Sequence, residues 1–423
     1  MSAPAPATRP WRSIADRITL LAPSGVDDTT TFLDATFDSA TPAPPFADER
    51  MEAVAALSAA FLEHPLLRRD PASVAAAFWM RKAQLHRLRE GLERRATAEP
   101  GVIRVAAGRV LHMAPANVDT LFLYSWVLGF LCGNAGIVRL SRDAGQVVSA
   151  MLEVVSEVAS SHAVVISSSR FLTWDHDDAV TGAVSAWCSQ RVLWGGDATV
   201  QAIRPLALPP HAGERVFGTK FSYAVLSAGS WRSAAASERA RVAAGCFNDL
   251  FWFDQMACSS PSLVFWVGSR AEVTEAVAGF DEALQAEAAR RAYRPAASAA
   301  SHRRGFAFEM AADDDVRVHL EFPAFVSVRA ADGVIPSRET CGGGLLRHHR
   351  LDTLASLASF ATEADQTLTH WGFSAAEIVS VAEVLGSRGV DRVVPVGEAL
   401  AFESVWDGFD LMDDFTRRVR VRA

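Results

Sequence analysis

Positive charge and long apolar runs are both scarce in this sequence. Its 49 acidic residues outnumber its 41 basic ones, and the net charge of −8 disfavours nucleic acid or an anionic membrane surface as the main partner. The longest apolar stretch, residues 121–132, falls short of the roughly 20 residues that cross a bilayer. The apolar run at residues 18–21 is too short for a secretory leader. We therefore expect a cytoplasmic protein without a membrane span.

Paired cysteines and the common catalytic motifs are also missing. The five cysteines have no regular spacing, which indicates reduced thiols rather than a disulfide framework. The sequence contains no phosphate loop, no G-x-G-x-x-G, no G-x-S-x-G and no Cys/His cluster at metal spacing. His348 and His349 are adjacent on an expected strand, so their rings point to opposite faces and cannot share an ion. Any chemistry must then use a lone nucleophile, an organic cofactor, or neither, and we expect no metal site.

The composition that remains is that of a globular protein with a core. Half of the residues are hydrophobic, and 423 residues correspond to two or three domains of roughly 150 residues each. We interpret the first 50 residues as a loosely structured lead-in and residues 51–95 as helical. Strands are expected at residues 136–140, 164–167, 191–194 and 221–226, and helices at 146–160, 178–188 and 197–203. This alternation predicts a parallel sheet covered by helices, which binds ligands at the carboxyl ends of its strands.

The second half of the chain repeats this pattern. Strands are expected at residues 263–267, 316–320, 324–328, 345–349 and 367–370, and helices at 233–253, 272–291, 351–362 and 375–385. The Ala/Ser/Arg-rich residues 294–304 are interpreted as a loop of low complexity. Charged and apolar residues alternate over residues 416–422, which suits an edge strand where subunits could pair.

Four segments carry a family resemblance. They are residues 112–118 with 133–141, residues 192–197 with 215–220, residues 253–261, and residues 389–397 with 406–408. Together, and in this order, they resemble the signatures of the LuxC-type acyl-CoA (fatty acyl) reductases, a branch of the aldehyde dehydrogenase superfamily. The resemblance implies an α/β fold with two Rossmann-like parallel-sheet domains and a C-terminal strand for oligomerisation.

The resemblance also implies a domain organisation. Residues 101–229 would form a dinucleotide-binding domain, to which residues 389–423 return, and residues 230–388 a catalytic domain. Residues 1–100 would pack on the first domain as a helical and irregular lead-in. The nicotinamide would then be expected between the two domains, facing the catalytic cysteine.

Cys258 is the expected nucleophile. Its position between a helical stretch and a polar Ser-Ser-Pro break favours an accessible thiol, and a thiolate is well suited to accept an acyl group from another thioester. Free cysteines are otherwise usually core residues, and we expect that for Cys132, Cys188, Cys246 and Cys341. The third signature of the family, which Cys258 matches, holds that family's nucleophilic cysteine.

Two further positions bear on the acyl chemistry. The resemblance implies that Asn117 donates a hydrogen bond to the oxyanion beside the backbone N–H of Cys258, although Asn is also a common helix cap. Val216 stands where the hydrolytic aldehyde dehydrogenases carry a glutamate base, and a valine cannot accept a proton. The absence of this glutamate favours reduction of the acyl-enzyme over its hydrolysis, unless Glu214, two residues earlier, acts as the base.

The cofactor residues also come from the resemblance. Gly195 and Gly196 lie between an expected strand and helix, where a backbone can approach a dinucleotide closely, although an ordinary tight turn would look the same. Arg139 and Ser141 match the superfamily's adenosine-ribose residues, and a cation there favours NADPH over NADH. A solvated arginine is the alternative for Arg139. Glu339 would match the glutamate that binds the nicotinamide ribose.

The sequence therefore predicts an NAD(P)H-dependent reductase that converts an acyl thioester to an aldehyde through a cysteine acyl-enzyme. The acyl donor would be coenzyme A, a carrier protein or a separate acyl-donor protein, and a homo-oligomer is expected. Two alternatives remain, an aldehyde dehydrogenase that works in the oxidative direction and a catalytically silent partner that binds an acyl carrier. His112 and residues 406–408 are expected to be structural.

Overall fold

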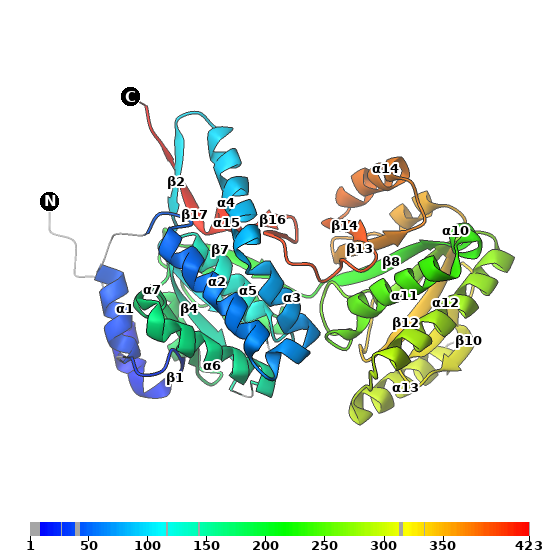
Figure 1. Cartoon of the computed structure of the whole chain (residues 1–423), viewed down its shortest axis with the longest axis horizontal. Coiled ribbons are helices and arrows are strands. Elements are labelled where there is room, and N and C mark those ends of the chain that lie inside the picture. Colours follow the sequence, from blue (N-terminus) through cyan, green and yellow to red (C-terminus); the bar gives the residue numbers. More distant parts are fainter. Residues whose placement is uncertain are drawn as a thin grey trace. The chain divides into compact units, whose positions relative to one another are not determined.

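The computed structural model in Figure 1 describes residues 9–26, 28–38, 43–115, 117–142, 144–312, 316–333 and 335–422. The chain forms two compact units, unit 1 at residues 1–218 and 402–423 and unit 2 at residues 219–401. The sequence placed these boundaries after residues 229 and 388. They lie elsewhere because strands at residues 221–227 and 392–395 pair within the sheet of unit 2.

Unit 1 contains most of the helices. Its elements are η1 (Pro10–Arg17), β1 (Thr19–Ala22), α1 (Thr29–Asp38), α2 (Asp48–Glu63), η2 (Leu67–Arg69), α3 (Pro71–Trp79), α4 (Lys82–Thr97), β2 (Val102–Ala106), β3 (Arg109–Met113), α5 (Leu121–Leu131), β4 (Ala135–Leu140), α6 (Gln146–Ser161), α7 (Ala163–Ser168), β5 (Ser169–Thr173), α8 (Asp178–Ser185), β6 (Gln190–Trp194), α9 (Asp197–Ile203), β7 (Gly213–Phe217), β15 (Val405–Trp406), β16 (Phe409–Asp410), α15 (Leu411–Asp414) and β17 (Thr416–Arg420).

The main sheet of unit 1 is doubly wound. Over the described residues its strand order is β1-β5-β4-β3-β6-β7, with β3 to β7 parallel and β1 antiparallel to β5. From β3 the chain proceeds first to β4 and β5 on one side and then to β6 and β7 on the other. The connections therefore reverse direction between β3 and β6, which is where such sheets bind ligands beyond their carboxyl ends.

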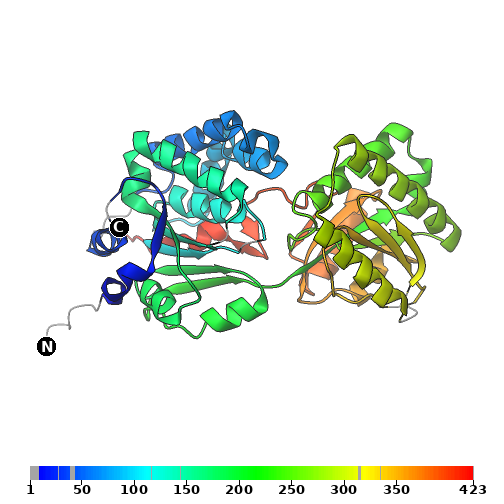
Figure 2. The same cartoon turned by 90° about the horizontal axis from the view of Figure 1, so that it is seen from below.

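Hydrophobic residues on both faces of this sheet explain its burial. Val110 packs with α2, α5 and α6 on one face, whereas its neighbour Leu111 packs with η1, α1 and α8 on the other. Strands β5 and β6 are buried at every position. Figure 2 shows helices above and below the sheet. A parallel sheet covered on both faces needs such continuous apolar strands.

Unit 2 is a second parallel α/β layer structure. Its elements are β8 (Phe221–Ser227), α10 (Ala228–Ser233), α11 (Ala236–Phe251), β9 (Leu263–Val267), α12 (Arg270–Arg290), α13 (Ala297–Ala312), β10 (Val316–Glu321), β11 (Val326–Ala330), β12 (Leu345–Leu351), η3 (Leu354–Ser359), β13 (Asp365–Trp371), α14 (Ala375–Gly386) and β14 (Arg392–Pro395). The strand order is β10-β11-β12-β9-β8-β13-β14, with β10 alone antiparallel among the described strands. Helices α11 and α12 cover one face, and η3 and α14 the other.

The last strand returns to the first half of the chain, as expected. Strand β17 pairs antiparallel with β2, so that Val419 lies opposite Ile103, and the two strands form a separate ribbon beside α4 (Figure 1). Both side chains are exposed, by 41% and 51%. The edge strand is thus confirmed. None of the described helices is both long and apolar enough to cross a membrane.

Four sequence predictions were wrong. Residues 164–167 belong to helix α7 and not to a strand, and strand β5 follows at once. Residues 294–304 were expected to be a loop, but most of them lie in α13, where alanine favours a helix and the buried Arg303 donates to the carbonyl oxygens of Ala324 and Gly343 at 2.8 Å each. The lead-in holds a strand of the main sheet, β1, and a 3-10 turn, η3, replaces the helix at residues 351–362.

Candidate active site

Cys258 lies in a tight loop between α11 and β9. Asp254 and Gln255 have φ angles of +48° and +61°, a left-handed conformation that turns the chain sharply after α11. The Gln255 N–H donates to the carbonyl oxygen of Leu250 at 2.6 Å and closes this turn. Cys258 follows three residues later and is half-buried. Cys258 is thus less buried than Cys132, Cys188 and Cys246.

The side chain of Gln255 fixes this loop to the start of β12. Its amide nitrogen donates to the carbonyl oxygens of Pro261 (2.9 Å) and Leu345 (3.1 Å). Its amide oxygen accepts from the N–H groups of Gly344 (3.1 Å) and Leu345 (3.0 Å). Gln255 is buried, so these four hydrogen bonds are shielded from water. The nucleophile loop and the glycine-rich residues 342–344 are therefore held as one piece.

Polar groups from two neighbouring strands contact Cys258. The Gln366 amide nitrogen, at the start of β13, lies 3.3 Å from the Cys258 sulfur. The Ser222 hydroxyl, at the start of β8, donates to the Cys258 carbonyl oxygen at 2.7 Å and accepts from the Thr367 N–H at 3.2 Å. These residues lie at the amino ends of their strands. Cys258 is therefore placed at the opposite strand ends from those where a parallel sheet usually binds ligands.

The remaining cysteines differ from Cys258 in burial. Cys132, Cys188 and Cys246 are buried, as expected, and burial raises the pKa of the Cys132 and Cys188 thiols to about 12. Burial also raises the pKa of Cys246 well above its ordinary value. Cys341 was expected in the core but is only half-buried, because it precedes the glycine turn at residues 342–344, which lies outside the sheet.

Glu339 lies on an exposed segment that is tied to the Cys258 loop. The guanidinium of its neighbour Arg338 donates to both carboxylate oxygens of Asp365, at 2.8 and 3.0 Å. The Gly343 N–H donates to the carbonyl oxygen of Asp254 at 2.7 Å. Glu339 itself is exposed. Unit 2 thus places the predicted ribose-binding glutamate on a loop anchored beside the predicted nucleophile.

In unit 1 the predicted residues gather at one sheet edge. Asn117 follows β3 and is exposed, Ser141 follows β4, and Gly195 and Gly196 follow β6. Because β3 lies between β4 and β6, the three loops meet at the carboxyl ends of adjacent strands. This edge includes the point between β3 and β6 where the chain connections reverse direction. The sequence therefore selected residues that the fold brings together within this unit.

Arg139 lies near the carboxyl end of β4. Its guanidinium donates to the carbonyl oxygen of Trp174 at 3.1 Å and lies 6.0 Å from the centre of that indole ring. The side chain is half-buried, and burial lowers the pKa of its guanidinium. The cost of removing such a cation from water can be offset by an anion that binds next to it. Arg139 is therefore a packed residue with a specific orientation and not a solvated surface arginine.

Val216 and Glu214, the two residues that bear on the hydrolytic base, both lie on β7. Val216 is on β7 and packs against the core that includes η1 and α8. Glu214, on the same strand, accepts a hydrogen bond from the Arg191 guanidinium at 2.7 Å and lies 3.4 Å from Arg204. Glu214 therefore has structural partners in both of these arginines.

The histidines have structural surroundings. His112 is buried, bonds the Ser125 hydroxyl at 2.8 Å, and burial lowers its pKa to about 3. His348 packs against Trp266 and His349 against Phe265, on opposite faces of the sheet as expected. Among the described residues, no three metal-ligating side chains lie close enough together to hold an ion.

Residues 406–408 form a hairpin turn next to the core of unit 1. The Trp406 ring lies 6.0 Å from that of Tyr124 and 6.5 Å from that of Trp194. Asp407 has a φ of +48° and Gly408 a φ of +74°, as a tight turn between β15 and β16 requires. These contacts pack the returning chain against unit 1.

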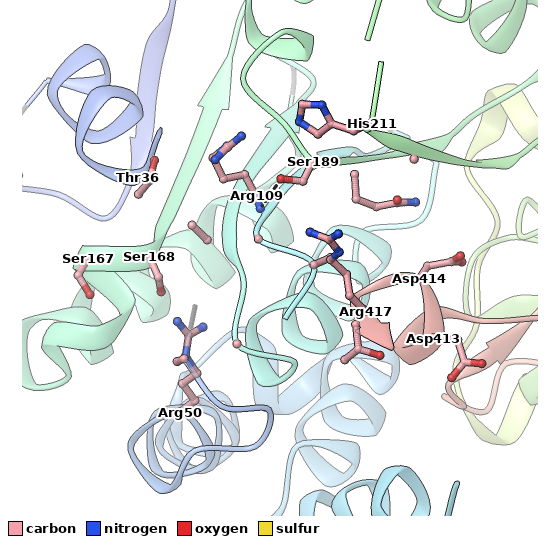
Figure 3. Close-up of a pocket in the computed structure, with 18 residues that line it drawn as sticks. Thr36, Arg50, Arg109, Ser167, Ser168, Ser189, His211, Asp413, Asp414 and Arg417 are labelled. Carbon is pink, nitrogen blue, oxygen red and sulfur yellow. Dashed lines mark hydrogen bonds between the residues drawn. The ribbon is translucent and has the colours of Figure 1, made fainter. Parts of the chain in front are cut away.

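A cavity of about 760 Å³ lies at the other edge of the unit 1 sheet. Figure 3 shows residues that line it. Its lining includes Arg109, at the start of β3, and Gln190, at the start of β6, so it lies at the amino ends of these strands. Arg50, Ser189 and His211 also face it. None of the residues that the sequence singled out for catalysis or cofactor binding lines this cavity, so we place no step of the chemistry there.

Sequence reasoning missed the supporting residues of the nucleophile loop. Gln255 stands within the segment that carried the resemblance, so its proximity to Cys258 was a usable signal. Ser222 and Gln366 carry no such signal, because they are ordinary polar residues at the starts of strands far from Cys258 in the chain. Only the pairing of β8 with β13 brings them to the loop.

Comparison with known proteins finds a family match for most of the chain. Residues 84–418 match the family model described as acyl-CoA reductase (LuxC). A relative is the long-chain acyl-protein thioester reductase of Aliivibrio fischeri, which is 27% identical over 169 residues. That match covers 38% of this chain and 32% of the relative, so it spans about a third of the relative's length.

Solved structures with the same fold are aldehyde dehydrogenases. Lactaldehyde dehydrogenase from Escherichia coli superposes with a TM-score of 0.64 over 98% of this chain and 91% of its own, at 14% identity. An indole-3-acetaldehyde dehydrogenase in complex with NAD⁺ gives a TM-score of 0.63 over 92% and 86% of the two chains, at 11% identity. These likenesses establish an aldehyde-dehydrogenase fold with two Rossmann-like sheets.

Proposed function

This chain belongs to the acyl-CoA reductase (LuxC) family, and we propose from that premise that it reduces an acyl thioester to an aldehyde through an acyl-enzyme on Cys258. The observation that carries the proposal is the partial burial of Cys258 together with the hydrogen bond to its sulfur. Cys258 is half-buried in a loop fixed by Gln255, and its sulfur accepts a hydrogen bond from Gln366. Three of the other four cysteines are buried.

The first step is acyl transfer to Cys258. The thiolate attacks the thioester carbonyl carbon, an S–C bond forms, and the carrier sulfur leaves with the electron pair of the bond that breaks. We assign the stabilisation of the oxyanion to the backbone N–H of Cys258 and to the side chain of Asn117. Preorganised donors of this kind lower a barrier by about 3 kcal/mol each. The exposure of Asn117 after β3 supports its availability for this role.

A nicotinamide dinucleotide, when bound, supplies the hydride for the second step. The residues present fit such a cofactor. Gly196 is exposed and begins α9 with extended backbone angles (φ −63°, ψ 158°), and Gly195 adds no side chain to this turn. The carboxylate of Asp197 already occupies the first turn of α9, so the absence of side chains matters more here than the helix dipole. We assign Ser141 and Glu339 to the two riboses.

We further propose NADPH as the preferred reductant. The half-buried guanidinium of Arg139 uses one N–H for the Trp174 carbonyl oxygen and can direct another to a 2′-phosphate. Burial lowers its pKa, which means that its charge is poorly solvated and that a phosphate partner would stabilise it. Arg139 is thus the residue on which the choice between NADPH and NADH would depend.

The residues around the acyl-enzyme favour reduction over hydrolysis. Val216 cannot activate water, and the Glu214 carboxylate is held by Arg191. Hydride addition to the acyl carbon gives a thiohemiacetal oxyanion on Cys258. Its collapse releases the aldehyde and returns the electron pair of the S–C bond to the sulfur. The chain therefore favours an aldehyde product rather than a free acid.

The substrate and the assembly are proposed on separate grounds. The relative from Aliivibrio fischeri is named for long-chain acyl-protein thioesters, and we propose an acyl group carried on a protein or on coenzyme A for this chain. The exposed Ile103 and Val419 on the β2–β17 ribbon support a homo-oligomer formed through that ribbon.

The test is an assay of aldehyde formation with a mass measurement on the thiol. The protein is mixed with acyl-CoA and acyl-carrier thioesters of several chain lengths, the aldehyde is trapped after NADPH is added, and the peptide that contains Cys258 is weighed. We expect an acyl adduct that survives in water and disappears on reduction. Cys258→Ala should lose both adduct and aldehyde, while Cys341→Ala, at the other half-buried thiol, should keep them. Rapid release of free acid from the adduct would favour an aldehyde dehydrogenase instead.

A further inference from the structure

The contact between Gln366 and Cys258 has a defined direction. The amide nitrogen lies 3.3 Å from the sulfur, and the amide oxygen accepts a hydrogen bond from the Thr367 hydroxyl, also at 3.3 Å. In this orientation the N–H₂ group meets the sulfur, and the amide oxygen meets the Thr367 hydroxyl. An amide N–H₂ group can only donate. The sulfur of Cys258 is therefore the acceptor.

The residues on either side of Gln366 hold this geometry. Asp365, before it, is fully buried and accepts two hydrogen bonds from Arg338 and one from the Thr362 N–H at 2.9 Å. Thr367, after it, donates its N–H to Ser222, whose hydroxyl in turn donates to the Cys258 carbonyl oxygen. The strand position of Gln366 and the position of Cys258 are thus tied to each other through Ser222.

A buried donor of this kind distinguishes two states of the sulfur. Gln366 is 2% exposed, so water competes little for its N–H. A neutral thiol is a weak acceptor, whereas a thiolate makes a charge-assisted hydrogen bond that is about twice as strong as a neutral one. The contact therefore stabilises Cys258 in its ionised form, which is the form that attacks a carbonyl.

We propose that Gln366 is a catalytic residue that donates a hydrogen bond to the Cys258 thiolate. This inference rests on the proposed function of Cys258 as the nucleophile. Gln366 takes up no proton, and the thiol proton leaves to solvent before the attack. The hydrogen bond weakens while the sulfur is acylated and uncharged. It strengthens again when the S–C bond breaks, so that Gln366 also favours release of the aldehyde.

The charged groups on the surrounding elements have hydrogen-bond partners of their own. On β13, Asp365 is paired with Arg338, and at the start of β12 the buried Arg347 directs a guanidinium N–H to the Ser337 carbonyl oxygen at 2.8 Å. Before β8, Lys220 donates to the Glu363 carbonyl oxygen at 2.8 Å. A substitution at Gln366 leaves all of these residues in place.

The test measures the ionisation of Cys258 in the whole protein without cofactor or substrate. The rate of alkylation by iodoacetamide is followed against pH by mass spectrometry of the peptide that contains Cys258. Gln366→Leu keeps the size of the side chain but removes the donor, and it should raise the apparent pKa of Cys258 and slow alkylation at pH 7 by about tenfold. Gln285→Leu is the matched control. This amide of unit 2 accepts from the Ala324 N–H and should leave the profile unchanged.

A second variant keeps the proposal falsifiable if the leucine variant does not fold. Gln366→Glu is nearly isosteric and places a negative charge beside the sulfur, so it should raise the apparent pKa further than leucine does. Profiles of both variants that superpose on that of the unchanged protein would overturn the proposal. Aldehyde formation by Cys258→Ser gives the separate answer on the proposed function. Loss of aldehyde in that variant together with unchanged Gln366 profiles would overturn the role of Gln366 alone.

Discussion

At Asp249, on α11, a buried carboxyl group holds the turn that leads out of unit 2. Its two oxygens accept from the N–H groups of Gly397 at 2.7 Å and Ala399 at 2.9 Å, and the residue is 1% exposed. Burial raises the pKa of this carboxyl to about 7, although the two N–H donors act in the opposite direction. A native carboxyl that keeps its proton to higher pH than the unfolded chain does makes stability depend on pH.

The sign of this dependence gives a first prediction. The native state holds the Asp249 proton up to about pH 7, and the unfolded state loses it near its ordinary value of 3.8, so the free energy of unfolding should fall between these values as pH rises. In Asp249→Asn this contribution is absent. The free energy of unfolding of the variant should therefore lie closer to that of the unchanged protein at pH 8 than at pH 5. Urea unfolding at both pH values measures it, with the exposed Glu383→Gln as control. An equal difference at both pH values would contradict the prediction.

Gln255 gives a second prediction at the scale of one residue. Gln255→Leu fills the same space but leaves the backbone groups of Pro261, Gly344 and Leu345 without their partner. Unpaired buried polar groups are costly, and we expect a loss of about 3–5 kcal/mol in the free energy of unfolding. Denaturant titration measures it. A loss close to that of Gln285→Leu, which removes one hydrogen bond, would show that the loop does not depend on Gln255.

Arg139 gives a third prediction, on cofactor choice. Arg139→Gln removes the charge but keeps a donor for the Trp174 carbonyl oxygen, so the fold of unit 1 should persist. We expect the KM for NADPH to rise by about tenfold and the KM for NADH to change little, because only the former carries the extra phosphate. Steady-state assays with both cofactors test this. Equal effects on both would remove Arg139 from phosphate binding.

At the scale of elements, the β2–β17 ribbon is a short two-stranded sheet, and neither strand pairs with another of the described strands. Isolated ribbons of this kind are marginally stable, and this one places Ile103 and Val419 in solvent. Exposed apolar side chains on an unpaired edge are typical of a contact between chains. The ribbon is thus the element on which the proposed oligomer depends.

The corresponding prediction concerns assembly. Ile103→Lys combined with Val419→Lys should lower the mass of the protein in solution, because facing charges on the ribbon disfavour its burial. Light scattering after size-exclusion chromatography measures the mass. Val379→Lys, an exposed apolar residue on α14 of unit 2, is the control. An unchanged mass in the ribbon variant would place the subunit contact elsewhere.

At the scale of the whole molecule, the chain separates its chemistry between two units with separate cores. Unit 1 carries Asn117 and the proposed cofactor residues Arg139, Ser141, Gly195 and Gly196 at the carboxyl ends of its strands. Unit 2 carries the proposed nucleophile and its partners at the amino ends of its strands, together with Glu339. Unit 2 is a continuous insertion, because the chain leaves unit 1 after residue 218 and returns at residue 402.

This arrangement predicts which segments become protected from amide exchange when the cofactor binds. NADPH should slow amide exchange most in the loops after β3, β4 and β6, since ligand binding stabilises the residues that contact the ligand. The residues before the same strands, which line the cavity of Figure 3, should change least. Hydrogen-exchange mass spectrometry with and without NADPH measures this. Protection that is strongest around the cavity would move the cofactor to the other edge of the sheet.

The sequence by itself determined the family, the fold class and most of the elements, and it supplied the candidate site residues. The segment around Cys258, the glycine pair after β6 and the apolar strands are local patterns, and local patterns are readable without a fold. Short apolar runs were less certain. Residues 164–167 contain β-branched residues that suit a strand, yet they form α7, because packing against neighbouring elements decides between helix and strand over so few residues.

Only the tertiary structure decided which distant residues surround the thiol. Gln366 follows Cys258 by 108 positions in the chain, and its amide reaches the sulfur because β13 pairs with β8 while the Cys258 loop runs into β9 on the other side of β8. In the same way, Thr416 of β17 lies opposite Ala106 of β2, 310 positions earlier in the chain. Such contacts depend on strand order, and strand order follows from the packing of the complete sheet rather than from any one segment.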